Sequence, residues 1–323
     1  MSRFSDFGNS LYSGDRSFNF VGRRKIWYSI AAVFIALSVL IPVAKGGFNI
    51  GIEFRGGVEY RVPGETDANS QIAKDAVASV LPGENPVITT IGGNTLRIQT
   101  TKLSDADSKA IYTALLKGYK KTDKQVTKSF IGASWGADVT NKAINGLVWF
   151  LVLAAVLMSA YFRTLKMSAA AMMALIHDLV ITAGIYGITG FEVTPAAVIG
   201  FLTILGYSLY DTVVVFDKIR ENTFEVEFSQ TATFAERVNL AVNQTLVRSI
   251  NTSIVAVLPV AAILFIGSFV LGAGTLRDIA LALFVGIIVG TYSSIFIAPP
   301  AYAQMREREA KYKKAAEKVL AAR

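Results

Sequence analysis

Long apolar runs alternate with polar segments along this chain of 323 residues. A helix crosses the hydrocarbon core of a bilayer with about 20 residues, because each helical residue rises about 1.5 Å. Several runs reach that length with few charges or none, and the longest, Ser249 to Met305, is divided by glycines and by the charged pair Arg277 and Asp278. We therefore predict a polytopic α-helical membrane protein. Its six predicted transmembrane helices are residues 26–44, 143–162, 167–189, 193–217, 249–267 and 277–303.

The stretch between the first two spans, residues 45–142, has the pattern of a small folded domain. Apolar residues alternate with polar ones in some of its segments, as in half-buried strands, and recur at helical spacing in others. The order βαββα(β) favours a ferredoxin-like α+β domain. The predicted elements are a strand over residues 58–62, a helix over 72–80, a hairpin over 87–98, a helix that Ser104 caps and a weaker strand over 126–131.

Positive charge gathers on one side of the predicted spans. Five Lys or Arg precede the first span, two lie in the turn 163–166, four between residues 218 and 248 and seven after Gln304, whereas the short loops on the other side hold only Arg277. This positive-inside asymmetry places both termini in the cytoplasm and makes the α+β domain extracytoplasmic. The net charge of +8 then sets orientation and meets anionic membrane lipid, and no nucleic-acid partner is predicted. The predicted cytoplasmic segments are residues 1–25, the loop 218–248 and the basic tail 304–323.

The composition excludes several kinds of site. The chain is 52% hydrophobic, which is too apolar for an ordinary soluble domain, and it has no cysteine and one histidine. Disulfides and thiolate sites are excluded, and no metal is expected, because the carboxylates show no ligand spacing. The sequence contains no phosphate-binding loop and no nucleophile turn, so we expect no cofactor and no enzyme activity. The start lacks the cleavage site of a signal peptide, so the first span should be retained.

A carboxylate, Asp211, lies inside the fourth predicted span. A charge within a span costs about 3 kcal/mol unless it faces a partner or water, so Asp211 is a candidate functional residue. It lies about 24 Å along the helix from Pro195, so the alternative is an interfacial side chain that snorkels toward the cytoplasm. Arg248, at the start of the fifth span, is at a similar depth. It is predicted either to pair with Asp211 or to be an ordinary anchor at the cytoplasmic end of its helix.

A second candidate pair, His177 and Asp178, lies near the middle of the third predicted span. A histidine titrates near neutral pH and a buried carboxylate can exchange protons with it, so the pair could pass protons. The alternative is that Asp178 hydrogen-bonds a neighbouring helix and stabilises the bundle.

The last predicted span carries a stripe of small residues at four-residue spacing. Such a stripe lets two membrane helices approach closely, either as a contact that slides or rocks during function or as plain packing. The stripe consists of Ala282, Gly286, Gly290 and Ser294.

Several motifs along the chain match one family. The longest runs from Tyr207 to Asn222 and contains Asp211 and Asp217. On these motifs the chain resembles the SecF family over nearly its whole length, a family of membrane subunits that work with SecD beside the bacterial Sec translocon. The other matching motifs are Gly51-Ile52-Glu53-Phe54-Arg55-Gly56-Gly57, His177-Asp178, Asn243-Gln244-Thr245-Leu246 with Arg248, Arg277-Asp278, and Gly286 to Ser294 with Gly290 between them.

Two places depart from the pattern of that family. The family commonly reads Gly-Ile-Asp-Phe-Thr-Gly-Gly in the first motif, where this chain has Glu53 and Arg55, and Asn before the aspartate of the fourth span, where this chain has Tyr210. Glu53 keeps the negative charge. Tyr210 removes an amide beside Asp211, which puts in doubt any role of that amide in this chain.

The resemblance implies one half of a transporter of the resistance-nodulation-division superfamily, completed by SecD in pseudo-twofold fashion in the bacterial plasma membrane. It implies that the proton-motive force powers late, ATP-independent steps of preprotein translocation and release. Asp211 and Arg248 match the proposed proton-relay positions of the family, and Asp178 lies in a matching motif beside His177. The implied partners are SecD, the SecYEG translocon, SecA, YajC and the preprotein substrate.

Two other kinds of function remain open from the sequence. One is a proton-coupled small-molecule exporter, for which a six-span half would have to form a homodimer. The other is a passive assembly scaffold without ion coupling. For the coupled functions, the ion is either H⁺ or Na⁺.

Overall fold

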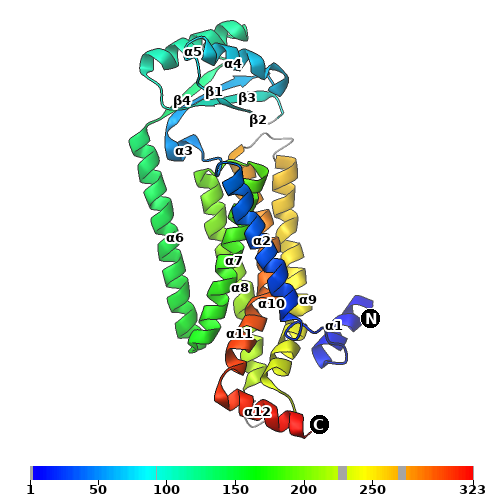
Figure 1. Cartoon of the computed structure of the whole chain (residues 1–323). Helices are drawn as coiled ribbons and strands as arrows, with labels where there is room; N and C mark the ends of the chain where they lie inside the picture. Colours follow the sequence, from blue (N-terminus) through cyan, green and yellow to red (C-terminus); the bar gives the residue numbers. More distant parts are fainter. Residues whose placement is uncertain (1–2, 92, 225–230, 268–273, 323) are drawn as a thin grey trace.

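Long helices form an elongated bundle that carries a small α+β domain at one end (Figure 1). The computed structural model describes residues 3–91, 93–224, 231–267 and 274–322. Among these residues, six helices are long and apolar enough to cross a membrane, which confirms the predicted number of spans. Both chain ends lie at the end of the bundle opposite the α+β domain (Figure 1). The long helices are α2 (Arg24–Ala44), α6 (Ala133–Phe162), α7 (Leu165–Thr189), α8 (Pro195–Thr223), α9 (Phe234–Ala262) and α10 (Gly274–Phe296).

The helices extend beyond the predicted spans, because an apolar run marks only the part of a helix that crosses the membrane. The predicted loop 218–248 is helical at both ends, since α8 continues to Thr223 and α9 begins at Phe234. A capping box starts α9: the Thr233 hydroxyl accepts a hydrogen bond from the Glu236 amide, and the Glu236 carboxylate accepts one from the Thr233 amide. The predicted terminal segments are partly helical too. The remaining helices of the bundle are α1 (Arg3–Ser13), the π-helical turn η3 (Ile263–Gly267), α11 (Ala298–Glu307) and α12 (Ala310–Ala321).

The α+β domain contains a four-stranded antiparallel sheet with the strand order β2-β3-β1-β4. The central strand β1 places Tyr60 opposite Ile98 of β3 and Lys128 of β4. Tyr60 and Ile98 are fully buried, together with apolar residues of α4 and α5. Ser104 caps α5 as predicted, with its hydroxyl accepting a hydrogen bond from the Asp107 amide at 3.1 Å. The elements are α3 (Ile52–Arg55), β1 (Gly57–Pro63), the 3₁₀ turn η1 (Asp67–Asn69), α4 (Ser70–Ala78), β2 (Val87–Ile91), β3 (Thr95–Thr100), α5 (Asp105–Gly118) and β4 (Thr127–Ile131).

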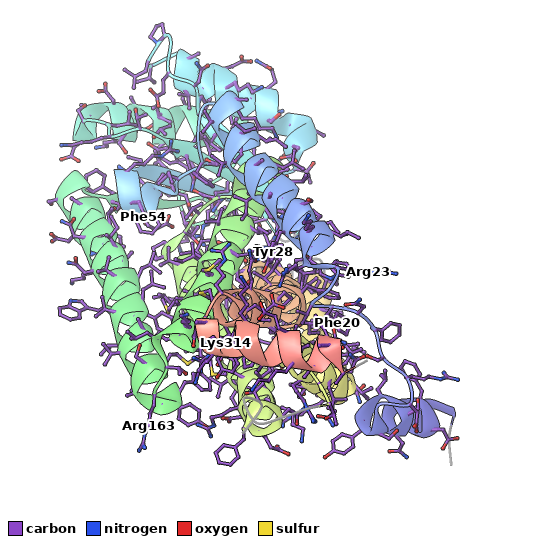
Figure 2. The ribbon with its side chains drawn as sticks, turned by 60° about the horizontal axis from the view of Figure 1, so that its bottom comes forward. Phe20, Arg23, Tyr28, Phe54, Arg163 and Lys314 are labelled. Atoms are coloured by element: carbon purple, nitrogen blue, oxygen red, sulfur yellow. The ribbon has the colours of Figure 1, made fainter. Side chains whose placement is uncertain are left out.

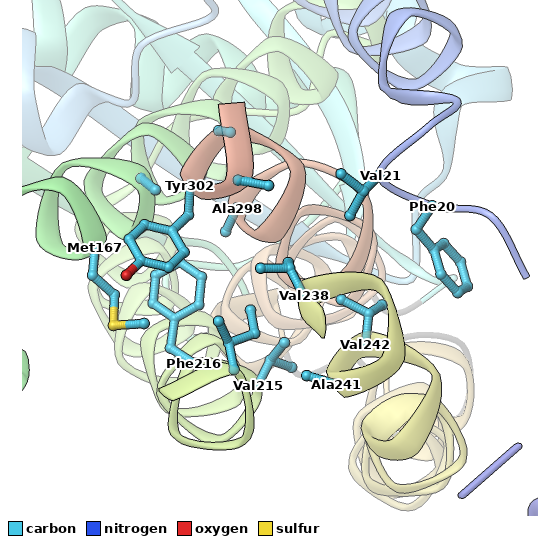
Figure 3. Close-up of a cluster of buried hydrophobic side chains, with 14 of the residues drawn as sticks. Phe20, Val21, Met167, Val215, Phe216, Val238, Ala241, Val242, Ala298 and Tyr302 are labelled. Carbon is cyan, nitrogen blue, oxygen red and sulfur yellow. The ribbon is translucent and has the colours of Figure 1, made fainter. Parts of the chain in front are cut away.

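An aromatic and aliphatic core joins the helices at the end of the bundle near the termini (Figure 3). Phe216 of α8 packs against Tyr302 of α11, with ring centroids 5.7 Å apart, and Met167 of α7 and Val238 of α9 lie beside them. Figure 2 looks toward this end, which α12 crosses with Lys314. This core fixes α7, α8, α9 and α11 to one another at the end of the bundle near the termini.

Three of the spans are central and three are peripheral. Along their most apolar windows, about half of the residues of α7, α8 and the span that begins in α10 are buried, whereas α2, α6 and α9 bury few. The buried carboxylates predicted from the sequence lie on the central helices α7 and α8, where other protein atoms surround them.

Candidate carboxylate site in the membrane bundle

Asp211 lies on α8 with 5% of its surface exposed, and hydroxyl groups from two other helices surround it. The Ser249 hydroxyl of α9 donates to Oδ1 at 2.9 Å, and the Ser294 hydroxyl of α10 donates to Oδ2. Ser249 and Ser294 are both completely buried. A carboxylate in this position is held between three helices by neutral donors, which rules out a side chain that snorkels to the surface.

Asp178 on α7 is even more deeply buried and has a similar set of partners. The hydroxyls of Ser208 on α8 and Ser293 on α10 donate to Oδ2 at 2.5 and 2.7 Å. Its other oxygen, Oδ1, lies 2.9 Å from Nδ1 of His177, and the second ring nitrogen of His177 is buried without a hydrogen-bond partner. The ring of Tyr292 stacks on that of His177 with centroids 5.9 Å apart. His177 is therefore attached to the carboxylate on one side and has a free ring nitrogen on the other.

The two carboxylates form one polar group, which we call the carboxylate–serine cluster. Helix α10 connects them, because consecutive residues of it, Ser293 and Ser294, bond to different carboxylates. Four helices meet there, so a change of charge on either carboxylate alters hydrogen bonds between helices rather than within one. The cluster consists of Asp178, Asp211, Ser208, Ser249, Ser293 and Ser294.

Arg248 does not pair with Asp211. It forms no hydrogen bond or ion pair with any described residue; its side chain is exposed and lines a cavity of about 770 Å³ beside Asp217 and Thr245. Successive residues of an α-helix are about 100° apart around its axis, so Ser249 rather than Arg248 faces the carboxylate. Of the two alternatives for Arg248, pairing with Asp211 is therefore wrong, and a neutral donor one position along the chain takes that place.

The small-residue stripe of α10 packs directly on α8. A methyl group on Gly286 would overlap the side chain of Ile204, and one on Gly290 would lie 3.0 Å from Cβ of Ser208. Gly200 of α8 meets Ala282 in the same way. The missing side chains let the two helices approach closely enough for serine hydroxyls to reach the carboxylates across the interface.

The other predicted site residues lie outside the cluster. Asp217 accepts a hydrogen bond from the Tyr161 hydroxyl at 2.8 Å, near the end of α8. Arg277 lies over the ring of Phe191, 4.8 Å from its centroid, and Asp278 accepts a hydrogen bond from Thr194 at 2.8 Å. These two residues are thus at the end of the bundle next to the α+β domain.

The first motif forms the connection between that domain and the bundle. The amide of Gly51 donates to the carbonyl of Val193 at 2.9 Å, and Glu53 lies on the short helix α3. Gly56 and Gly57 have φ angles of +77° and +153°, which lie in the region that favours glycine. A side chain on Gly57 would also meet the carbonyl of Thr100 in the neighbouring strand. The glycines of this motif therefore turn the chain from α3 into the central strand of the sheet.

Comparison with known proteins identifies the family. Residues 111–308 match the family model for the C-terminal region of the protein export membrane proteins SecD and SecF. The protein translocase subunit SecF of Streptomyces coelicolor is 44% identical over 323 residues, which cover all of this chain and 86% of that protein. The chain belongs to the SecF family. The SecF subunit of Mycobacterium tuberculosis strain H37Rv is 41% identical over 94% of this chain and 70% of its own length. Members of this family are transport subunits rather than enzymes.

Solved structures of SecDF have the same fold as this SecF-family chain. The crystal structure of SecDF from Thermus thermophilus matches with a TM-score of 0.78 and 32% identity, over 91% of this chain and 39% of that one. A structure of SecDF in a super-membrane-facing form matches 94% of this chain with a TM-score of 0.59. The chain thus spans about two fifths of SecDF.

Sequence reasoning named Ser294 only as a small residue of the stripe and did not predict that the serines of this SecF-family site bond to the carboxylates. Ser208 lies three residues before Asp211, which is one helical turn, and Ser249 directly follows Arg248. Serine or threonine residues within a predicted span, close to a carboxylate on the same or a neighbouring span, are the sequence signal that indicates such donors. Among the described residues, no group of three or more His, Cys, Asp or Glu is arranged to hold a metal ion.

Proposed function

We propose that this chain is the SecF subunit of a complex with SecD that uses the proton-motive force to assist late, ATP-independent steps of preprotein translocation and release. The family membership supports a role in Sec-dependent protein export. The carboxylate–serine cluster carries the proposal of ion coupling. Two carboxylates at the centre of the bundle have hydroxyls as their inter-helix donors, an arrangement that accommodates the gain and loss of a proton.

The proposed relay consists of Asp211, Asp178 and His177, with Arg248 near the end of the pathway closer to the termini. An ionised carboxylate accepts hydrogen bonds from serines, whereas a protonated one also donates. Protonation of Asp211 therefore changes its bonds to α9 and α10 and shifts these helices against α8. The membrane potential supplies about 2.3 kcal/mol per charge per 100 mV, which is enough to bias such a two-state contact.

We further propose that both termini are cytoplasmic in a bacterial plasma membrane, so that the α+β domain is extracytoplasmic. The charge asymmetry of the loops supports this orientation, and the termini and the domain lie at opposite ends of the bundle (Figure 1). The domain is proposed to be ferredoxin-like, because its chain order βαββαβ and antiparallel strand order β4-β1-β3-β2 suit that fold.

SecD is the proposed direct partner. The outward faces of α2, α6 and α9 are apolar and mostly exposed, as expected for helices that meet lipid or another membrane subunit. The matching protein of Thermus thermophilus is named SecDF, and this chain matches about two fifths of its length, which supports the pairing of SecF with SecD. SecYEG, SecA, YajC and the preprotein are proposed as further partners in export.

The test is preprotein release from inverted membrane vesicles with the gradient present and collapsed. The wild type should release preprotein faster with the gradient, and Asp211→Asn should reduce the rate to the level without a gradient. Glu221→Gln, which changes a 68% exposed carboxylate on the same helix, is the matched control. Collapse of the pH gradient and removal of Na⁺ in separate arms identify the ion. Gradient-dependent release by Asp211→Asn equal to that of the wild type would contradict the proposal.

A further inference from the structure

The α+β domain and the membrane bundle meet at a small polar junction. The start of the first motif and the residues just before it run beside the turn between α7 and α8: the Val193 amide donates to the carbonyl of Asn49 at 2.7 Å, and the Gly51 amide donates to the carbonyl of Val193 at 2.9 Å. Arg97 of β3 forms an ion pair with Glu192 of the same turn. These contacts hold the sheet to the turn between α7 and α8.

Three glutamates lie at this junction but only two of them have a cation. Glu59 of β1 accepts from Arg61 at 2.6 Å and from Gln99 at 3.1 Å. Glu192 is paired with Arg97. Glu53 forms no ion pair with any described residue, so no cation contacts its carboxylate when it is ionised.

Two carboxylate oxygens at the junction are buried without a hydrogen-bond partner: Oε2 of Glu53 and Oε1 of Glu192. Both face the backbone of Gly51, because a side-chain carbon on that glycine would lie within 3.4 Å of each. Glu192 as a whole is 8% exposed. Two ionised carboxylates that face the same stretch of backbone repel, and a buried acceptor without a donor is costly.

The charges that face Glu53 come from several elements. Glu59 lies on β1, Arg97 on β3 and Glu192 on the turn between α7 and α8, and these three groups act on Glu53 electrostatically. On α10, Asp278 interacts electrostatically with Arg277, its neighbour in sequence. It also interacts electrostatically with Glu192 and Arg97. Helix α6 packs on α3, and the first carboxylate along α6 is the exposed Asp138. Lys45 follows the end of α2 and donates to the Ile188 carbonyl at 2.6 Å.

We propose that Glu53 is a proton-binding site at this junction, and that its proton holds the α+β domain docked on the bundle. With the proton bound, the carboxylic acid adds no second negative charge beside Glu192 and provides the donor that the two oxygens lack. Without it, Glu53 and Glu192 repel across Gly51 and the junction opens. The site is distinct from the carboxylate–serine cluster and does not depend on which ion drives export.

The direction of the pH effect follows from the surroundings of Glu53. Burial raises the pKa of its carboxyl above the ordinary value of 4.5, and Glu192 and Glu59 raise it further, against a backbone hydrogen bond and Arg97, which lower it. A carboxyl whose pKa is raised in the docked state stabilises docking fully below its ordinary pKa. This stabilisation is lost as the pH rises through the raised pKa.

The chain connections of the α+β domain permit such an opening. Its two ends continue into α2 and α6, and α6 diverges from α7 toward the domain (Figure 1). A methyl group on Gly136 of α6 would overlap the carbonyl of Phe54, so α6 packs closely on α3. The domain, α3 and the start of α6 can therefore move together when the junction with Glu192 opens.

The test measures docking directly in the full chain in lipid nanodiscs. The chain has no cysteine, so Lys74→Cys on α4 and Thr189→Cys at the end of α7 carry two spin labels at exposed positions and nowhere else. The label distance should be single at pH 5, and a longer population should grow between pH 5 and 9. For each unit by which docking raises the pKa of Glu53, the equilibrium constant for docking should be about tenfold smaller at high pH than at low pH. In Glu53→Gln, the docked distance should persist at every pH.

Two further variants and a second readout complete the test. Glu192→Gln should weaken the pH dependence, because it removes the repelling charge. Glu65 lies away from the junction, and its carboxylate is 3.4 Å from Nζ of Lys121. Glu65→Gln should therefore keep the pH dependence of the wild type. One component of the infrared band of protonated carboxyls should titrate in the wild type, and this component should be missing from Glu53→Gln. A wild-type distance that does not change with pH, or a pH dependence that Glu53→Gln retains, would overturn the proposal.

Discussion

Two regions of this chain contain buried carboxylates, and these carboxylates have different kinds of partner in the two regions. In the carboxylate–serine cluster, both oxygens of Asp178 and both of Asp211 have a hydrogen-bond partner, and the donors between helices are neutral hydroxyls. At the junction, arginines compensate Glu59 and Glu192, while Glu53 is left without one. The first arrangement bonds helices together through its carboxylates. The second makes a contact between domains depend on a proton.

The close contact between α8 and α10 beside the cluster should give the largest effect. Gly286→Leu places a side chain where Ile204 already lies, so the helices α8 and α10 must separate and the serines lose the carboxylates. We expect a loss of about 3 kcal/mol in the free energy of unfolding, measured by thermal denaturation in nanodiscs. Gly206→Ala is the control, because a methyl group there meets no atom within 4 Å. Equal losses in the two variants would show that the close approach is not what stabilises the site.

The ion pair of the junction should give the next largest effect. Arg97→Gln leaves the buried Glu192 carboxylate without its cation and next to Glu53. We expect docking to weaken by about 3 kcal/mol, seen as a loss of the short label distance at pH 7. Lys121→Gln, which removes a cation elsewhere in the same domain, should leave docking intact. Unchanged docking in Arg97→Gln would contradict the importance of this pair.

A single hydroxyl of the cluster should matter less. Ser294→Ala removes the donor to Oδ2 of Asp211 but keeps the Ser249 bond to Oδ1. The expected loss of stability is about 2 kcal/mol, because one buried acceptor becomes unsatisfied. Thr203→Ala changes an exposed hydroxyl of α8 that bonds only its own helix, to the Ile199 carbonyl at 2.8 Å, and should cost less than about 0.5 kcal/mol. If the two variants lose the same stability, the hydrogen bond of Ser294 does not hold the cluster together.

An ion pair near the terminus gives the smallest effect and a baseline for both regions. Burial acts to raise the pKa of Glu309, but Lys166 at 2.8 Å and Arg306 at 2.9 Å outweigh it and hold the pKa below the ordinary value. This stabilisation is present above the ordinary pKa and is lost as the pH falls through the lowered one. Glu309→Gln should cost about 0.5 kcal/mol at pH 7 and nothing at strongly acidic pH. A cost that grows as the pH falls would contradict this assignment.

The sequence predicts much of the fold but less of the two sites. The number of spans and the strands of the α+β domain follow from apolar runs and alternation, because burial sets both patterns. The start of α9 at Phe234 was missed, although Thr233 and Glu236 form a capping box that is readable from the sequence. Hydropathy gives no signal there, since the first turns of α9 lie outside the apolar run.

The partners of the carboxylates needed the structure. Asp211 and Asp178 were candidates because charge is rare in a span, but a rotation of about 100° per residue decides whether Arg248 or Ser249 faces Asp211. Glu192 drew no attention, because a charged residue in a short turn between spans is ordinary. Its relation to Glu53 arises only when the α+β domain folds back on the bundle.

The central claim is that the carboxylate–serine cluster passes the coupling ion. The most direct measurement is proton flux out of inverted vesicles that contain the complex and an internal pH-sensitive dye, recorded while preprotein is exported into them. We predict that the wild type and Glu221→Gln pass protons during export, and that Asp211→Asn passes none above the leak of empty vesicles. Proton flux in Asp211→Asn equal to that of the wild type would contradict the account.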